Sequence, residues 1–127
     1  MNRISTMVVD DEPLAAQLLG DYVRQTPFLS LEGICSSAVE AFSMWQEHPA
    51  DLLFLDIQMP QMNGYTATQK IRDLSRSDAR TVPILAMTAD AFSEDIEAAM
   101  AVGMNAHLAK PLDINLVIRT ISRFLNR

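Results

Sequence analysis

The chain has 127 residues, is 49% hydrophobic and carries a formal net charge of −6. That length suits one domain with one hydrophobic core, so we expect a single domain over residues 1–127. The acidic balance disfavours direct binding of nucleic acid, because phosphate contacts dominate that affinity. No apolar run approaches the ~20 residues of a membrane span, and no secretory signal is evident. With one cysteine, Cys35, which we expect in the core, the sequence predicts a cytoplasmic protein without membrane contact.

Apolar, strand-like segments alternate with helix-like segments along the chain. The expected strands lie at about residues 4–9, 29–35, 52–56, 83–87 and 105–109. Helices are expected to begin at Pro13, after the capping box Ser37–Glu40, near Gly64, near Asp90 and after Asp113. Gly103 is typical of the C-terminal cap of the fourth of these helices.

Apolar residues spaced three or four apart predict which side of each helix faces the core. The residues expected there are Leu14, Leu18 and Tyr22; Ala41, Phe42 and Trp45; Tyr65, Thr68 and Ile71; Phe92, Ile96 and Met100; and Val117, Ile121 and Phe124. Met87 and Met104 are also expected to pack in the core rather than on a binding surface.

Five repeats of strand and helix predict a parallel sheet with helices on both faces. Residues 52–55 are continuously apolar, as in a central strand, whereas residues 29–32 alternate, as in an edge strand. With right-handed crossovers, this favours a flavodoxin-like, doubly wound (βα)5 α/β fold with strand order 2-1-3-4-5. In that fold, ligands bind at the carboxyl ends of the first and third strands.

Polar residues stand at the carboxyl ends of four of these strands. Asp10 and Asp11 end the first, Asp56 the third, Thr88 the fourth and Lys110 the fifth. Two carboxylates ~5 Å apart repel by roughly 3 kcal/mol at an effective dielectric constant of about 20. A cation would relieve that repulsion, and a few oxygen ligands with room for water favour Mg²⁺. The sequence therefore predicts a magnesium site at this edge of the sheet.

The same residues suggest phosphoryl chemistry. A carboxylate nucleophile can form an acyl phosphate when a metal also holds the phosphoryl group, and Asp56 is placed to do so. Lys110 and the hydroxyl of Thr88 would then bind the remaining phosphoryl oxygens and stabilise charge during in-line transfer.

The motifs VVDDE, FLDIQMPQMNG, MTA and KP together resemble the receiver domain of two-component response regulators, over essentially the whole chain. The resemblance implies that Asp56 is the phosphoacceptor. It implies that Asp11, Asp56 and the backbone carbonyl of Gln58 bind Mg²⁺ directly, while Asp10 acts through water. It also implies that Pro60 and Gly64 shape the loop after the acceptor, Gly64 as a residue free of side-chain constraint where the chain turns.

By the same resemblance, Thr88 and Lys110 are the phosphate-binding switch pair, and the Lys110–Pro111 bond is expected to be cis. Better-known receivers carry Tyr or Phe three residues before the lysine, where this chain has His107. His107 would turn inward as a further switch residue. Gln58 and Asp90 would tune dephosphorylation.

A receiver would accept its phosphoryl group from a histidine kinase or a histidine phosphotransfer protein and release no external product. Phosphorylation would switch the surface formed by the fourth helix, fifth strand and fifth helix. The first half of the chain is similar to receivers of LytTR-type regulators, and the second half to those of hybrid histidine kinases. A homodimer would pair two oppositely charged groups on the last two helices: Arg119, Arg123 and Arg127 with Glu94, Asp95 and Glu97.

Two other classes of protein use related chemistry or the same fold. A haloacid-dehalogenase-like phosphatase also forms an aspartyl phosphate, but it carries a DxD motif on its first strand, where this chain has Asp10-Asp11-Glu12. A flavin-binding protein needs a Ser/Thr/Gly-rich phosphate loop after the first strand. Pro13-Leu14-Ala15 supplies none.

Overall fold

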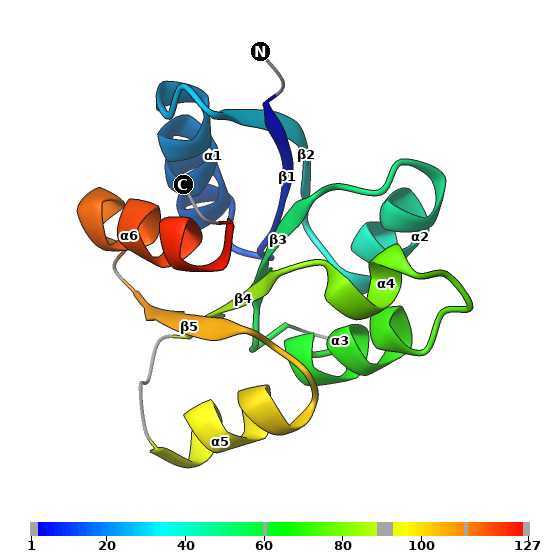
Figure 1. The fold of residues 1–127 in the computed structure, drawn as a ribbon. Coiled ribbons are helices and arrows are strands. Elements are labelled where there is room, and N and C mark those ends of the chain that lie inside the picture. The colour runs from blue at the N-terminus through cyan, green and yellow to red at the C-terminus, as the bar shows by residue number, and fades with distance from the viewer. Residues whose placement is uncertain (1–2, 60, 89–92, 111, 126–127) are drawn as a thin grey trace.

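The computed structural model describes residues 3–59, 61–88, 93–110 and 112–125. Five parallel strands form one sheet in the order β2-β1-β3-β4-β5, which confirms the predicted fold (Figure 1). The strands are β1 (Ile4–Val9), β2 (Leu29–Cys35), β3 (Leu52–Asp56), β4 (Ile84–Thr88) and β5 (Ala106–Ala109). The helices are α1 (Pro13–Gln25), α2 (Ala38–Glu47), α3 (Gly64–Arg72), α4 (Asp78–Thr81), α5 (Ser93–Ala101) and α6 (Ile114–Leu125). The one-turn α4 was not predicted, so the expected fourth and fifth helices are α5 and α6.

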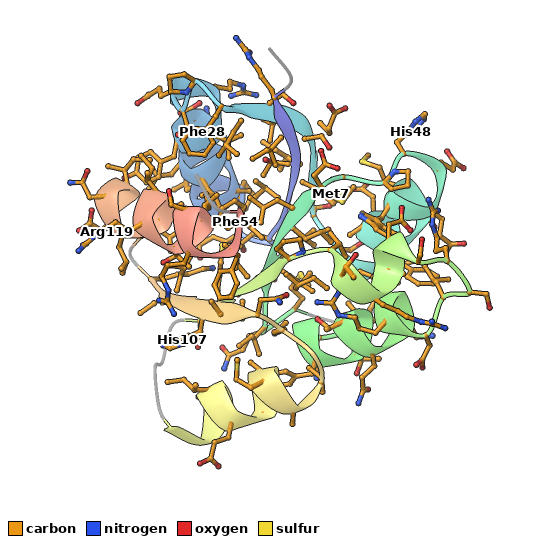
Figure 2. All side chains as sticks on the ribbon, viewed as in Figure 1. Met7, Phe28, His48, Phe54, His107 and Arg119 are labelled. Atoms are coloured by element: carbon orange, nitrogen blue, oxygen red, sulfur yellow. The ribbon has the colours of Figure 1, made fainter. Side chains whose placement is uncertain are left out.

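The sheet lies between two layers of helices. In Figure 1, α1 and α6 cover one face, and α2, α3, α4 and α5 lie on the other. Met7 of β1 packs in the core on the α2 and α3 side, whereas Phe54 of β3 packs on the α1 and α6 side (Figure 2). All of β3 is buried, as predicted for a central strand, and β2 is an edge strand.

Local signals in the sequence set several helix ends. The Ser37 hydroxyl accepts a hydrogen bond from the Glu40 N–H at 3.1 Å and caps α2. Pro13 is the first residue of α1, and Gly103 follows α5 with a φ of 102°, the left-handed conformation of a C-terminal cap. These three predictions are confirmed.

Most residues predicted to face the core do so, and on α1 this holds for Tyr22, but the prediction was wrong for Leu14 and Leu18. Leu14 and Leu18 are 77% and 44% exposed, and α1 instead buries Ala16, Leu19, Gly20 and Val23. The reason is close packing: a Cβ added at Gly20 would lie 2.9 Å from Ile34 Cδ1 of β2. Helix α1 therefore approaches the sheet on the side of Ala16, Leu19 and Gly20, and Leu14 and Leu18 face outward.

The same effect corrects the prediction for α5. Met100 is 51% exposed, and the small Ala99 is fully buried in its place. Phe92 and the expected helix start at Asp90 lie outside the described residues. Cys35, Met87 and Met104 are buried as predicted, and burial raises the pKa of the Cys35 thiol to about 12. None of the helices within the described ranges is long and apolar enough to cross a membrane.

Candidate functional site

The predicted site residues converge at one edge of the sheet. Asp10 follows β1, Asp56 and Thr88 are the last residues of β3 and β4, and Lys110 follows β5. Asp10, Asp56 and Thr88 are at most 5% exposed, although their side chains are polar or charged. Parallel strands bring their carboxyl ends to the same edge, so residues 100 positions apart in the chain become neighbours.

Three carboxylates form a compact cluster. Asp10, Asp11 and Asp56 each offer one oxygen, and these oxygens all lie within 4.8 Å of one another. Asp10 and Asp56 are buried, whereas Asp11 is exposed and keeps the cluster open to solvent. Because the donors are hard oxygens and water can complete the coordination, the cluster has the chemistry of a Mg²⁺ site.

Lys110 contacts two of these carboxylates. Its Nζ lies 2.7 Å from Asp10 Oδ2 and 3.5 Å from Asp56 Oδ1. The other oxygen of Asp10, Oδ1, accepts a hydrogen bond from the Glu12 N–H at 3.0 Å. The Lys110 backbone N–H donates to the Thr88 carbonyl at 2.8 Å, which fixes the end of β5 against β4. Lys110 is therefore part of the site rather than a solvated surface lysine.

The site perturbs the acid–base properties of its members. Burial, together with the charges of Asp10 and Asp11, raises the pKa of Asp56 to about 7, although Lys110 acts to lower it. Burial lowers the pKa of Lys110, but the hydrogen bond to Asp10 and the charge of Asp56 outweigh burial, so the pKa is raised. The one ammonium group therefore compensates only part of the crowding among the carboxylates.

Gly64 is required at the site, but for a different reason from the one predicted. Its N–H donates to the Ile57 carbonyl at 2.9 Å, and a Cβ at this position would lie only 2.6 Å from the Asp56 carbonyl oxygen. Any side chain would collide with the backbone of the strand that carries Asp56. The left-handed backbone conformation in this loop is at Gln61, with a φ of 70°, and not at Gly64.

The remaining predicted residues are only partly placed. Gln58 is exposed two residues after Asp56, and His107 is half-buried in β5 opposite Ala86 of β4 (Figure 2). Asp90, Pro60 and the Lys110–Pro111 bond involve positions outside the described residues.

An apolar groove next to the site was not predicted from the sequence. The groove has a volume of about 440 Å³ and is lined by Asp10, Glu12, Leu14, Ala15, Leu18, Lys110 and Leu112. The available signal was the pair Leu14 and Leu18 directly after the acidic motif. The helical spacing of the pair predicts a core position, but both leucines are exposed.

Comparison with known proteins agrees with this geometry. Residues 6–122 match the response regulator receiver domain family, and the chain belongs to that family. It is 31% identical over 121 residues to the polar-differentiation response regulator DivK of Brucella ovis, and the match covers 95% of each chain. It is 40% identical over 89 residues to the probable histidine kinase 2 of Oryza sativa subsp. indica. That match covers 66% of this chain but only 8% of the kinase.

Two solved structures are similar along nearly the whole chain. One is the receiver domain of the sensor histidine kinase PA1611 from Pseudomonas aeruginosa, solved with a magnesium ion in its active-site cleft. It has a TM-score of 0.86 and 26% identity, covering 98% of this chain and 99% of that one. The other is the Ssk1 receiver domain of Saccharomyces cerevisiae, solved with the histidine phosphotransfer protein Ypd1. It has a TM-score of 0.84 and 26% identity, and the match covers 97% of this chain and 89% of the Ssk1 chain. The chain is thus a receiver domain of two-component phosphorelay signalling.

Proposed function

We propose that this receiver accepts a phosphoryl group on Asp56 and acts as a phosphorylation-dependent switch. The observation that carries the proposal is the position of Asp56 at the end of β3. Its carboxylate clusters with those of Asp10 and Asp11 and lies 3.5 Å from the Lys110 ammonium. A buried nucleophile beside a cation site and a fixed ammonium is the arrangement that phosphoryl transfer needs.

The proposed reaction exchanges one bond at phosphorus for another. A carboxylate oxygen of Asp56 attacks the phosphorus of a phosphohistidine, and a P–O bond forms as the P–N bond breaks. The electron pair of that P–N bond remains on the imidazole nitrogen of the donor. The Lys110 Nζ, which already contacts Asp56, offsets negative charge on the phosphoryl oxygens. The hydroxyl of Thr88, at the end of the neighbouring strand, donates a hydrogen bond to one of these oxygens.

We assign Mg²⁺ to the carboxylate cluster as the cofactor. Both oxygens of Asp10 already accept hydrogen bonds, from Lys110 and from the Glu12 N–H. This favours direct coordination by Asp11, Asp56 and the backbone carbonyl of Gln58, with Asp10 acting through water. Bound Mg²⁺ would neutralise the carboxylates and hold phosphoryl oxygens near the nucleophile.

Further roles belong to the same proposal. Gln58 and Asp90 tune hydrolysis of the acyl phosphate, and His107 is a switch residue beside Thr88. The domain spans residues 1–127, acts in the cytoplasm without direct contact to nucleic acid or membrane, and releases no external product. Its switched surface is formed by α5, β5 and α6, and the exposed Arg119 and Arg123 on α6 are available to a homodimer there.

Asp56→Asn should abolish phosphorylation, because the amide removes the nucleophilic oxygen while keeping the shape of the side chain. With acetyl phosphate and Mg²⁺, intact mass should show one added phosphoryl group on the wild type and none on the variant. Asp21→Asn is the matched control, because Asp21 forms only an exposed ion pair with Arg24. An Asp56→Asn protein that is labelled as fully as the wild type would refute the assignment.

We further propose that the phosphohistidine donor docks in the groove beside the site. The donor in this proposal is a histidine kinase or phosphotransfer protein that presents its histidine on a helix. Leu14 and Leu18 are the exposed apolar wall of the groove, and Lys110 and Asp10 are its polar end. A helix lying against the two leucines would present a phosphohistidine towards Asp56. The Ssk1 receiver, solved with its phosphotransfer protein, supports a partner of this kind.

Leu14→Glu should slow phosphotransfer from a phosphorylated histidine phosphotransfer domain by about tenfold or more, because it places a charge in the centre of an apolar contact. Labelling by acetyl phosphate should be unchanged, since that small donor does not need the groove. Leu116→Glu on α6 is the control, because Leu116 is also exposed but does not line the groove. Equal slowing with both donors would contradict the docking proposal.

A further inference from the structure

Side chains of α3 donate hydrogen bonds to the first turn of α5 and to the loop that follows α5. At one end, the Tyr65 hydroxyl donates to the Asp95 carbonyl at 3.2 Å. At the other end, Arg72 donates from Nε and Nη2 to the Gly103 carbonyl at 3.2 and 2.7 Å, and from Nη2 to Asn105 Oδ1 at 3.0 Å. Tyr65 and Arg72 are seven residues apart and so lie on the same side of α3. Helix α3 thus supports α5 at two separate points.

The two attachments differ in strength. The Arg72 guanidinium is half-buried, and its Nη1 also donates to the Ala79 and Val82 carbonyls at 3.0 and 2.8 Å. Hydrogen bonds from a charged donor are roughly twice as strong as neutral ones. Tyr65 contributes one neutral hydrogen bond. Among the described residues, Arg72 therefore holds the C-terminal side of α5 more strongly than Tyr65 holds its first turn.

Tyr65 is also linked closely to the strand that carries Asp56. Its neighbour Gly64 donates a hydrogen bond to the Ile57 carbonyl and packs so tightly that no Cβ would fit beside the Asp56 carbonyl. Because this contact is so close, we expect a displacement of the backbone at Asp56 to displace Tyr65 as well. The Tyr65 ring packs against the core on the α2 and α3 side of the sheet, which restricts its own movement.

We propose that Tyr65 is a positioning residue that couples Asp56 to the first turn of α5. A chemical change at Asp56 moves Tyr65 through Gly64 and thereby alters its hydrogen bond to Asp95, while Arg72 holds the opposite end of α5. This inference rests on the proposed function, because it takes Asp56 as the phosphoacceptor. It adds a route on the α3 side of the site to the proposed switch residues Thr88 and His107.

The test compares hydrogen exchange of the amides of residues 95–101 in the wild type and in Tyr65→Phe. Exchange is measured on the full chain, with and without beryllofluoride and Mg²⁺ as a phosphoryl mimic. In the wild type, the mimic should change the exchange rates of the α5 amides. In Tyr65→Phe, the mimic should change these rates about fivefold less. Tyr22→Phe is the matched control: Tyr22, the other tyrosine, donates to the Leu112 carbonyl at 3.5 Å and should leave the response as in the wild type.

The alternative is that the Tyr65–Asp95 hydrogen bond only stabilises the fold. Tyr65→Phe would then raise exchange by the same factor with and without the mimic, and that result would overturn the inference. A wild-type α5 that does not respond to the mimic would overturn it as well. Intact-mass labelling by acetyl phosphate is measured in parallel. A wild type that takes up no phosphoryl group refutes the proposed function and the inference with it. If labelling is normal, but the ratio of exchange with the mimic to exchange without it is the same in Tyr65→Phe as in the wild type, the inference alone is refuted.

Discussion

Asp56→Asn should stabilise the metal-free protein by about 2 kcal/mol at pH 8, a rise in melting temperature of roughly 8 °C. Folding raises the pKa of Asp56 from 3.8 to about 7, mainly because the carboxyl is buried. Each pKa unit corresponds to about 1.4 kcal/mol, so the ionised Asp56 carboxylate lowers the free energy of unfolding by at most about 4 kcal/mol. We expect about half of this limit, because Asp11 keeps the cluster open to water.

The effect of Asp56→Asn should depend on pH in a defined direction. Between pH 3.8 and about 7, the folded wild type holds a proton on Asp56 that the unfolded chain has lost, so lowering the pH stabilises the wild type. Asparagine does not titrate. The advantage of the variant should therefore be complete above pH 7 and should shrink as the pH falls towards 3.8.

Thermal unfolding in EDTA at pH 8 and pH 5 measures the stability difference between Asp56→Asn and the wild type. Acidic groups outside the site titrate alike in both proteins, so their contributions cancel in this difference. Asp21→Asn, at an exposed position, should change stability little at either pH. A fall in melting temperature for Asp56→Asn at pH 8 would contradict the crowding of carboxylates on which the magnesium assignment rests.

Lys110→Met should destabilise the metal-free protein by about 3 kcal/mol at pH 8. The change removes the ammonium that contacts Asp10 at 2.7 Å and Asp56 at 3.5 Å, and leaves two buried carboxylates without their cation. Breaking a buried ion pair on one side costs about 3–5 kcal/mol, and we take the lower end because the Lys110 side chain is 20% exposed.

A double-mutant cycle of Lys110→Met and Asp56→Asn tests whether the loss of stability comes from the contact between these two side chains. Asp56→Asn should lower the cost of Lys110→Met by about 1 kcal/mol or more, because one of the two uncompensated carboxylates is then absent. Saturating Mg²⁺ should also reduce the defect, since the metal supplies positive charge to the same oxygens. Urea unfolding in EDTA and in Mg²⁺ measures both effects. Lys70→Met is the control, because Lys70 is exposed on α3. Equal costs of Lys110→Met with and without Asp56→Asn would show that the two side chains do not interact.

The sequence determined the order of strands and helices and the edge of the sheet at which the site lies. Strand β3 was identifiable because a strand covered on both faces must be apolar throughout. Ser37 and Gly103 were identifiable as helix caps because a cap depends only on the side chain or backbone conformation at the helix end. The parallel topology then placed Asp10, Asp56, Thr88 and Lys110 at one edge. These features depend on periodicity and chain connectivity, both of which can be read from a single sequence.

Other features were decided only by tertiary packing. The spacing of Leu14 and Leu18 is the same whether they face the core or solvent, and the choice depends on how closely Ala16 and Gly20 let α1 approach the sheet. Likewise, sequence did not reveal that Gly64 avoids a collision with the Asp56 carbonyl, or that Tyr65 reaches the Asp95 carbonyl. Distances between segments that are remote in the chain fix these contacts, and such distances exist only once the helices have packed on the sheet.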